Sequence, residues 1–322
     1  MRAIINTEYG SPEVAKLMEV DKPIPKEKEV LIKVYATTVN RTDRGFRSAE
    51  YFISRFWTGL FNPKYHTLGC EFAGEIEQVG GEVTLFNKGD KVFGFDSDKC
   101  GSHAEYKVIE EGKAIATMPK NLTYNEAAPI CEGGHYALCD IRAAKVERGQ
   151  NVLVNGATGA IGSAAVQLLK YFGANVTAVC DTKNVMLVKS LGADFVIDYL
   201  KEDFTKTDEK YDFIYDSVGK SSFGKCKPLL KENGIYKSTE LGKNAENIYL
   251  ALITPILGGK RVLFPIPTIT KEDVTFLKRL VENGEFKPVF DREYPLEQIV
   301  EAYRYVETGQ KIGNVVIRVA EI

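Results

Sequence analysis

The sequence predicts an α/β protein with two domains, an irregular β-rich domain and a domain built on a doubly wound parallel sheet. Its 322 residues are too many for a single small hydrophobic core. Short β-rich runs separated by Gly, Pro, Asn and Asp occupy residues 1–122, whereas strand and helix patterns alternate after residue 122. Because alternating strands and helices connect through right-handed crossovers, the second pattern indicates a parallel sheet.

The β-rich part contains three clear strand patterns, at residues 30–34, 72–79 and 91–95. Residues 44–63 between the first two are aromatic and only weakly periodic. This composition is typical of a loop or short helix that covers a cleft, and we predict a lid there.

The alternating part begins with a predicted helix at 126–144, a strand at 151–154 and a helix at 163–172 that ends before a glycine. Further strands are predicted at 176–180, 194–197, 213–215 and 234–237, and further helices at 184–191 and 223–230. The tail is predicted to contain helices at 271–284 and 295–307 and strands at 286–290 and 314–319. These elements predict domains at 1–122 and 123–265, with residues 266–322 rejoining the first domain.

The composition is that of a globular protein. A hydrophobic fraction of 44% is too high for a disordered chain, and a net charge of −2 gives no broad attraction to nucleic acid or a membrane surface. The six cysteines include no C-x-x-C pair, which is expected of reduced thiols in a cytosol. The N-terminus turns polar by Asn6, and no apolar segment has membrane-spanning length. We therefore predict a cytoplasmic protein with neither nucleic acid nor membrane as a partner.

The sharpest motif is a turn of small residues between an apolar strand and a helix, Val152-Leu153-Val154-Asn155-Gly156-Ala157-Thr158-Gly159-Ala160-Ile161-Gly162. Gly159 lets backbone amides approach a pyrophosphate, Gly162 lets helix and strand pack closely, and the helix N-terminus favours negative charge. A second strand ends in Asp181, roughly twenty residues later, where an acidic residue reads the adenosine ribose. The motif predicts a dinucleotide site that includes Thr158, Gly159, Ala160 and Ile161. A tight turn without a ligand is the alternative.

Two neighbouring residues favour different dinucleotides. Asp181 would accept hydrogen bonds from the ribose hydroxyls of NAD, whereas Lys183 would pair with the 2′-phosphate of NADP. Cofactors of such sheets bind at the carboxyl ends of the strands. The further candidates at predicted strand ends are Tyr199, Ser217, Val218, Pro265 and Ile266.

Several blocks of residues, spread over nearly the whole chain, carry a family resemblance. They are Thr38-Val39-Asn40-Arg41-Thr42-Asp43, Gly69-Cys70-Glu71-Phe72-Ala73-Gly74, Lys88-Gly89-Asp90-Lys91-Val92-Phe93-Gly94, Ala157-Thr158-Gly159-Ala160-Ile161-Gly162, Leu191-Gly192-Ala193-Asp194 and Ile312-Gly313-Asn314-Val315-Val316. With these blocks the chain resembles the medium-chain dehydrogenase/reductase superfamily, and within it the quinone-oxidoreductase, or zeta-crystallin-like, branch. The resemblance implies a GroES-like β-rich catalytic domain, a Rossmann domain, a cleft between them, and a homodimer formed through the Rossmann sheets.

The resemblance departs from the zinc-dependent alcohol dehydrogenases of the superfamily at the zinc ligands. Asn40 stands where their first cysteine ligand lies, Cys70 stands where their histidine lies, and only Cys100 is present where their four-cysteine lobe would follow. Cys70, Glu71 and Cys131 could converge on a metal, but a catalytic zinc needs about three protein ligands with an open fourth position. A buried thiol and a core carboxylate are the favoured interpretation, so we predict no zinc.

Without a Lewis acid, hydride transfer to a conjugated acceptor demands less of a protein than oxidation of an unactivated alcohol. We therefore predict an enzyme in which NADP(H) or NAD(H) reduces a quinone or an α,β-unsaturated carbonyl. Asn40 is predicted to contact the substrate or the nicotinamide ribose, with capping of a turn as the alternative. Tyr51 is predicted to stabilise the developing negative oxygen within an aromatic wall of Phe46, Phe52 and Trp57, with plain packing as the alternative.

Tyr136 lies in the block Gly133-Gly134-His135-Tyr136-Ala137, where the family often has a threonine that touches the carboxamide. We therefore predict Tyr136 near the nicotinamide. None of His66, His103 and His135 is singled out as a proton donor. Two other functions stay open, a zinc-type alcohol dehydrogenase and a non-catalytic NAD(P)H-binding protein.

Overall fold

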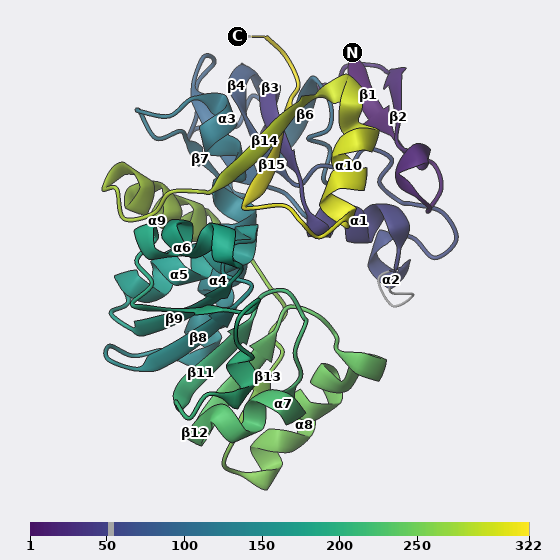
Figure 1. Ribbon diagram of the computed structural model, residues 1–322. Coiled ribbons are helices and arrows are strands. Elements are labelled where there is room, and N and C mark those ends of the chain that lie inside the picture. The colour runs from purple at the N-terminus through teal and green to yellow at the C-terminus, as the bar shows by residue number, and fades with distance from the viewer. Residues whose placement is uncertain (51–54, 322) are drawn as a thin grey trace. The chain divides into compact units, whose positions relative to one another are not determined.

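The computed structural model describes residues 1–50 and 55–321 and divides into two compact units (Figure 1). The first unit contains Met1–Glu132, Ile269–Gly284 and Pro288–Ile322, and the second contains Gly133–Thr268 and Glu285–Lys287. The chain passes from the first unit to the second after Glu132, because the short helix α3 (Tyr124–Ala127) and the 3-10 turn that follows it pack on strands of the first unit.

The first unit is built on a mostly antiparallel sheet with strand order β14-β15-β3-β4-β5-β7, in which β6 also pairs with β3. The strands of this sheet are β3 (Glu29–Val39), β4 (Glu71–Val79), β5 (Lys91–Phe95), β6 (Tyr106–Glu110), β7 (Ile115–Thr117), β14 (Phe290–Pro295) and β15 (Asn314–Arg318). The strands β1 (Arg2–Ile5) and β2 (Lys16–Glu19) form a separate antiparallel pair. Its other helices are α1 (Arg41–Ser48), α2 (Arg55–Thr58), α9 (Lys271–Glu282) and α10 (Ile299–Glu307). Side chains of β3, β4 and α10, such as Ile32, Phe72 and Tyr303, share its hydrophobic core.

The second unit is built on a sheet whose strands are all parallel, in the order β10-β9-β8-β11-β12-β13. Its strands are β8 (Asn151–Asn155), β9 (Asn175–Cys180), β10 (Phe195–Asp198), β11 (Tyr211–Asp216), β12 (Leu230–Ser238) and β13 (Arg261–Leu263). Its helices are α4 (Cys131–Ala144, which begins in the first unit), α5 (Ala160–Tyr171), α6 (Val185–Ser190), α7 (Phe223–Cys226) and α8 (Glu246–Leu257). In this order β8 is central, and the chain winds outward from it in both directions, which makes the sheet doubly wound.

Four local predictions were wrong. The predicted helix at 223–230 is α-helical only to Cys226, and strand β12 already begins at Leu230, because Leu230 pairs with Tyr211 of β11. No strand covers residues 286–289; β14 begins at Phe290 because it pairs with β15 from Asn314 onward. The predicted helix at 126–144 is interrupted at Pro129, whose ψ of 16° is not helical and whose ring nitrogen has no N–H to donate. The predicted helix at 295–307 is α-helical only from Ile299, after a 3-10 turn. The sequence analysis also missed α8, whose apolar residues show little helical periodicity.

Candidate active site

The turn between β8 and α5 has the close backbone packing that its glycines predict. Gly156 has a φ of 79°, which L side chains rarely adopt. A Cβ added to Gly162 would lie 2.1 Å from the carbonyl oxygen of Gly156. Ser217, directly after β11, donates its hydroxyl to the carbonyls of Asn155 (2.8 Å) and Gly156 (3.1 Å). The close approach of Gly162 and the hydrogen bonds from Ser217 therefore both fix the position of the turn.

The N-terminus of α5 is open to a ligand. Gly159 is the N-cap residue, and having no side chain it leaves the N–H groups of the first turn uncapped. A Cβ added to Gly159 would meet only the Gly156 carbonyl oxygen, at 3.8 Å. Free N–H groups at the end of a helix of 12 residues attract a phosphate through hydrogen bonds and the helix dipole.

The other predicted cofactor residues follow strand ends at the same edge of the parallel sheet. Asp181 follows β9, Tyr199 follows β10, Ser217 and Val218 follow β11, and Pro265 and Ile266 lie just beyond β13. Asp181 Oδ1 accepts from both the backbone N–H and the side-chain amide of Asn184, while Lys183 is exposed. The structure thus brings these residues to one edge, and their contacts with a cofactor stay predictions.

Tyr136 lies on α4, and its ring is tilted by 56° against the ring of His135, with the ring centroids 4.5 Å apart. One turn earlier, Gly133 lets α4 approach the start of α5, because a Cβ there would lie 2.5 Å from the carbonyl oxygen of Ala160. Tyr136 therefore lies about one turn along α4 from Gly133, the residue that packs on the start of α5.

Sequence reasoning missed Asp216, the last residue of β11. Its buried carboxylate accepts from the Asn155 side-chain amide (2.9 Å), the Ser221 N–H (2.8 Å) and the Tyr236 hydroxyl (3.2 Å). Asp216 thereby joins the ends of β8, β11 and β12 beneath the turn. An acidic residue that ends an apolar strand was the signal that could have identified it.

In the first unit, Asn40 caps α1. Its Oδ1 accepts from the N–H of Asp43 (2.9 Å), and Asp43 accepts from the N–H of Asn40 in return. This is a capping box, and Asn40 is only 3% exposed. The structure supports the capping alternative, and a contact of Asn40 with substrate stays a prediction.

A buried acid cluster, defined here as Asp43, Glu71 and Glu132, surrounds this cap. Glu71 accepts from the Thr38 hydroxyl (2.6 Å) and the Glu132 N–H (2.6 Å), and Glu132 accepts from the Thr42 hydroxyl (2.8 Å). The other carboxylate oxygen of Glu132, Oε2, is buried without a hydrogen-bond partner. Sequence reasoning missed Glu132, because a lone glutamate before two glycines gives no signal of burial.

Burial controls the protonation of this cluster. It raises the pKa of Glu71 to about 7, and it raises the pKa values of Glu132 and Asp43 as well, because desolvation disfavours the charged carboxylate. Burial also lowers the pKa of Lys311 to about 8, against the opposing attraction of Glu132. Near neutral pH, the cluster therefore holds protons that ordinary carboxylates have lost.

The residues at the zinc-ligand positions do not fit a catalytic zinc. Asn40 is occupied as a cap. The contact of Cys70 with Cys100, together with burial, raises the pKa of the Cys70 thiol well above its ordinary value. A cysteine binds zinc as a thiolate. Within residues 1–50 and 55–321, no group of three His, Cys, Asp or Glu residues is placed to hold a metal ion.

Only part of the predicted aromatic wall lies within the described residues. Tyr51 and Phe52 lie outside the described residues, as does the side chain of Trp57. Of that group, Phe46 is described, and it lies partly buried in α1.

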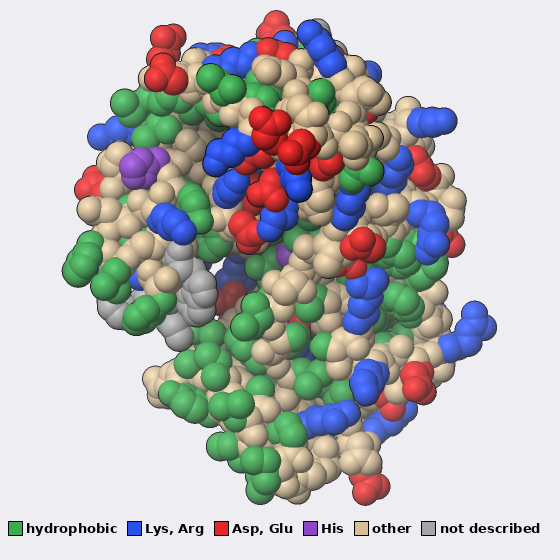
Figure 2. Space-filling model, turned by 180° about the vertical axis from the view of Figure 1, so that it is seen from behind, with side chains coloured by type: hydrophobic (Ala, Val, Ile, Leu, Met, Phe, Trp, Pro, Cys, Tyr) green, Lys and Arg blue, Asp and Glu red, His purple; other side chains and the backbone are tan. Residues whose placement is uncertain are grey.

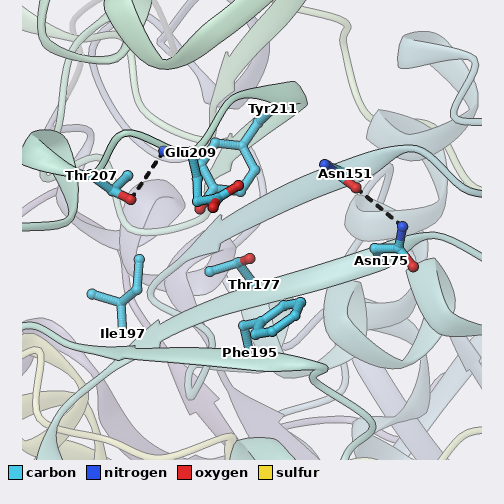
Figure 3. A pocket seen from close by; sticks show the side chains of 8 residues that line it. All are labelled: Asn151, Asn175, Thr177, Phe195, Ile197, Thr207, Glu209 and Tyr211. Carbon is cyan, nitrogen blue, oxygen red and sulfur yellow. Dashed lines mark hydrogen bonds between the residues drawn. The ribbon is translucent and has the colours of Figure 1, made fainter.

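A separate pocket of about 240 Å³ lies at the opposite edge of the parallel sheet (Figure 3). Its wall includes Asn151, Asn175, Phe195 and Tyr211, the first residues of β8, β9, β10 and β11. Because dinucleotides bind at the carboxyl ends of such strands, this pocket is not the cofactor site.

Comparisons with known proteins agree with this geometry. Residues 26–169 match the family described as "Alcohol dehydrogenase GroES-like domain", and residues 191–317 match "Zinc-binding dehydrogenase". The chain is 35% identical to a 2-methylene-furan-3-one reductase from Solanum lycopersicum, over 98% of this chain and 79% of that protein. It is 31% identical to the human quinone oxidoreductase, over 96% of this chain and 94% of that protein. The solved quinone oxidoreductase from Coxiella burnetii superposes with a TM-score of 0.86 at 28% identity, covering 99% of each chain.

A GroES-like unit and a Rossmann unit with a glycine-rich turn define an oxidoreductase of the alcohol-dehydrogenase type. The chain belongs to the medium-chain dehydrogenase/reductase superfamily, in its quinone-oxidoreductase branch. The predicted fold class and family are confirmed. No helix in the described part of the chain is long and apolar enough to cross a membrane.

Proposed function

We propose that this protein uses NADPH to reduce a quinone or an α,β-unsaturated carbonyl compound without zinc. The observation that carries the proposal is the open, glycine-lined N-terminus of α5, in a chain with full-length relatives named for these reactions. Besides the tomato and human proteins, these relatives include an Arabidopsis thaliana protein named NADPH-dependent alkenal/one oxidoreductase, at 31% identity over 98% of this chain.

In this proposal the pyrophosphate lies on the N–H groups that follow Gly159, as the free helix end favours. Lys183 pairs with the 2′-phosphate of NADPH. Asp181 opposes that phosphate less than a free carboxylate would, because its Oδ1 is already occupied by Asn184.

When bound, the nicotinamide supplies a hydride, and the acceptor oxygen then needs a proton. The chain's own candidate for holding that proton is Glu132. Burial raises its pKa, and Oε2 is the carboxylate oxygen left without a partner, since Thr42 donates to Oε1. Thr38 and the N–H of Glu132 fix the neighbouring Glu71, so the cluster keeps one geometry.

We further propose that a second copy of the chain covers α8. Hydrophobic side chains gather over this helix in the lower left of Figure 2, and Leu252, Ile256 and Leu257 are 67%, 85% and 76% exposed. The strand β13, which α8 precedes, is at the edge of its sheet, and an unpaired edge invites pairing with another chain. Sedimentation of the wild type and of Ile256→Glu tests this: a dimer that the substitution converts to monomer is expected, and a wild-type monomer would contradict it.

The activity is tested by stopped-flow oxidation of NADPH and of NADH by the metal-analysed protein, against quinones, enones and simple alcohols. Turnover of quinones or enones without bound zinc is expected. Turnover of alcohols with stoichiometric zinc would instead establish a zinc alcohol dehydrogenase. Tight cofactor binding without any turnover would establish a non-catalytic binding protein.

Cofactor choice is tested by Lys183→Ala, with the exposed Lys189→Ala as the matched control. Loss of one charge-assisted phosphate contact is expected to lower kcat/KM for NADPH by about tenfold and to leave NADH unchanged. Equal effects of the two substitutions would remove Lys183 from the cofactor site.

A further inference from the structure

Two buried cysteines of the first unit face each other and are not used in the proposed reduction. Cys70, just before β4, and Cys100, in the loop after β5, have Sγ atoms 3.7 Å apart. Both are buried, with 0% and 2% of their surface exposed. Because a disulfide has an S–S distance of about 2.05 Å, each sulfur needs to move by about 1 Å to form one.

The segments that carry these thiols are already joined by backbone hydrogen bonds. The N–H of Asp96 donates to the carbonyl of Cys70 at 2.8 Å, and the N–H of Gly101 donates to the carbonyl of Leu68 at 3.2 Å. Cys100 has a left-handed φ of 55°, and the space beside Gly101, where a Cβ would lie, is open. Rotation of the two side chains, with small backbone shifts at Gly101 and Cys70, can therefore close the gap without separating the segments.

We propose that Cys70 and Cys100 form a reversible redox site that hydrogen peroxide oxidises to an intramolecular disulfide. The sulfur of Cys100 attacks one peroxide oxygen and breaks the O–O bond, which leaves a sulfenic acid on Cys100 and releases water. The sulfur of Cys70 then attacks the sulfenic sulfur, forms the S–S bond and releases a second water. The two thiols lose two electrons and two protons, and one peroxide becomes two water molecules. A dithiol reductant reverses the reaction by exchange.

The surroundings favour Cys100 as the first nucleophile. The buried Lys107 side chain donates to the carbonyl of Cys100 and to the Ser102 hydroxyl, both at 3.1 Å, and pairs with Asp96 Oδ2 at 3.6 Å, so its cation lies close to Cys100 within an ion pair. Cys70 keeps its proton and acts second, in agreement with its raised pKa. Ser97 and Lys99, in the loop leading to Cys100, are exposed, so this buried thiol lies close to the surface that a small uncharged oxidant reaches.

The thiol pair is connected to the Asn40 cap. The N–H of Cys70 donates to Asp43 Oδ1 at 3.1 Å, and Asp43 completes the capping box with Asn40. Movement of Cys70 toward Cys100 displaces this carboxylate and the start of α1. This consequence rests on the proposed function, and it makes the oxidised enzyme a slower reductase.

The test treats the native, fully reduced protein with hydrogen peroxide, alkylates the remaining thiols and digests with trypsin. The expected product links residues 65–88 to residues 100–107, weighs two hydrogen atoms less than the two reduced peptides, and disappears after dithiothreitol treatment. NADPH turnover is expected to fall at least about tenfold on oxidation and to recover on reduction, since a displacement of about 1 Å near a site can cost up to about 100-fold.

Cys100→Ser is expected to abolish both responses. The matched control is Cys139→Ser, which removes a more exposed thiol and is expected to keep both. The proposal is overturned if the link forms only after denaturation, if Cys100 becomes a sulfinic acid, or if either cysteine pairs elsewhere. A disulfide that leaves turnover unchanged overturns the connection to Asn40. Should the protein reduce no acceptor at all, the mass measurement still decides whether the redox site exists.

Discussion

The glycine-rich turn of the second unit and the buried acid cluster of the first handle negative charge in opposite ways. The turn offers backbone N–H groups to an anion that comes from outside, and Gly159 leaves them uncovered. The cluster buries its own carboxyl groups, and burial keeps protons on Glu71 and Glu132 that exposed carboxylates lose.

The difference shows how sensitive each region is to substitution. Backbone geometry is set by hard contacts, so one added methyl group can break the turn. The cluster depends on hydrogen bonds and protonation, so its response to substitution changes with pH.

The largest effect is expected from Gly162→Ala. Its Cβ would lie 2.1 Å from the Gly156 carbonyl oxygen and 2.7 Å from Ser217 Oγ, so the turn must open. We expect the free energy of unfolding to fall by roughly 2–4 kcal/mol, measured by urea denaturation. An unchanged midpoint would mean that helix and strand can move apart freely, contrary to the rigid turn described above.

The next largest effect is the pH dependence contributed by Glu71. Its pKa of about 7 in the folded protein exceeds the ordinary value of 4.5, so the folded state binds this proton more tightly than the unfolded state. The stabilisation is complete below pH 4.5 and is lost as pH rises through about 7, which amounts to about 3 kcal/mol.

The glutamine in Glu71→Gln is uncharged at every pH. Urea denaturation of this variant is therefore expected to show no loss of the free energy of unfolding from this group between pH 4.5 and 7. The control is Glu301→Gln, an exposed position that is expected to keep the wild-type slope. Identical slopes in all three proteins would show that Glu71 does not hold the proton.

A smaller effect is expected from Gly159→Ala, which should weaken NADPH binding at the turn without changing the stability of the fold. Its φ of −70° suits alanine, and the added Cβ meets no atom closer than 3.8 Å, so the melting temperature should not change. The methyl group lies where the pyrophosphate must approach, and the Kd for NADPH measured by fluorescence titration is expected to rise about tenfold. Unaltered affinity would place the cofactor elsewhere.

The smallest effect is expected from Asn40→Ala, which removes the cap of α1. A lost cap costs about 1 kcal/mol of stability. Asn40→Ser keeps a hydroxyl that can accept from the N–H of Asp43, so it should restore most of that loss. If the serine variant is stable but loses turnover as fully as the alanine variant, Asn40 contacts the substrate as well as capping the helix.

The sequence by itself determined the glycine-rich turn, because Gly156, Gly159 and Gly162 are contiguous with the strand and helix they join, and their spacing specifies the local backbone geometry. It determined the parallel sheet for the same reason, because each strand and each helix has its own pattern of hydrophobic residues in the local sequence. It also placed Asp181 and Ser217 at one edge of the sheet, since strand ends in a parallel sheet meet there, and their contacts with a cofactor stay predictions.

Only the tertiary structure brought together Thr38, Glu71 and Glu132, or the thiols of Cys70 and Cys100. These residues come from segments that are far apart in the chain, and an isolated glutamate or cysteine has the same local pattern whether it is exposed or buried. Burial sets their protonation and their partners, and burial depends on the packing of strands β3, β4 and β5 with the start of α4. Residues whose chemistry is set by distant neighbours therefore carry no local signal, whereas residues that shape the backbone do.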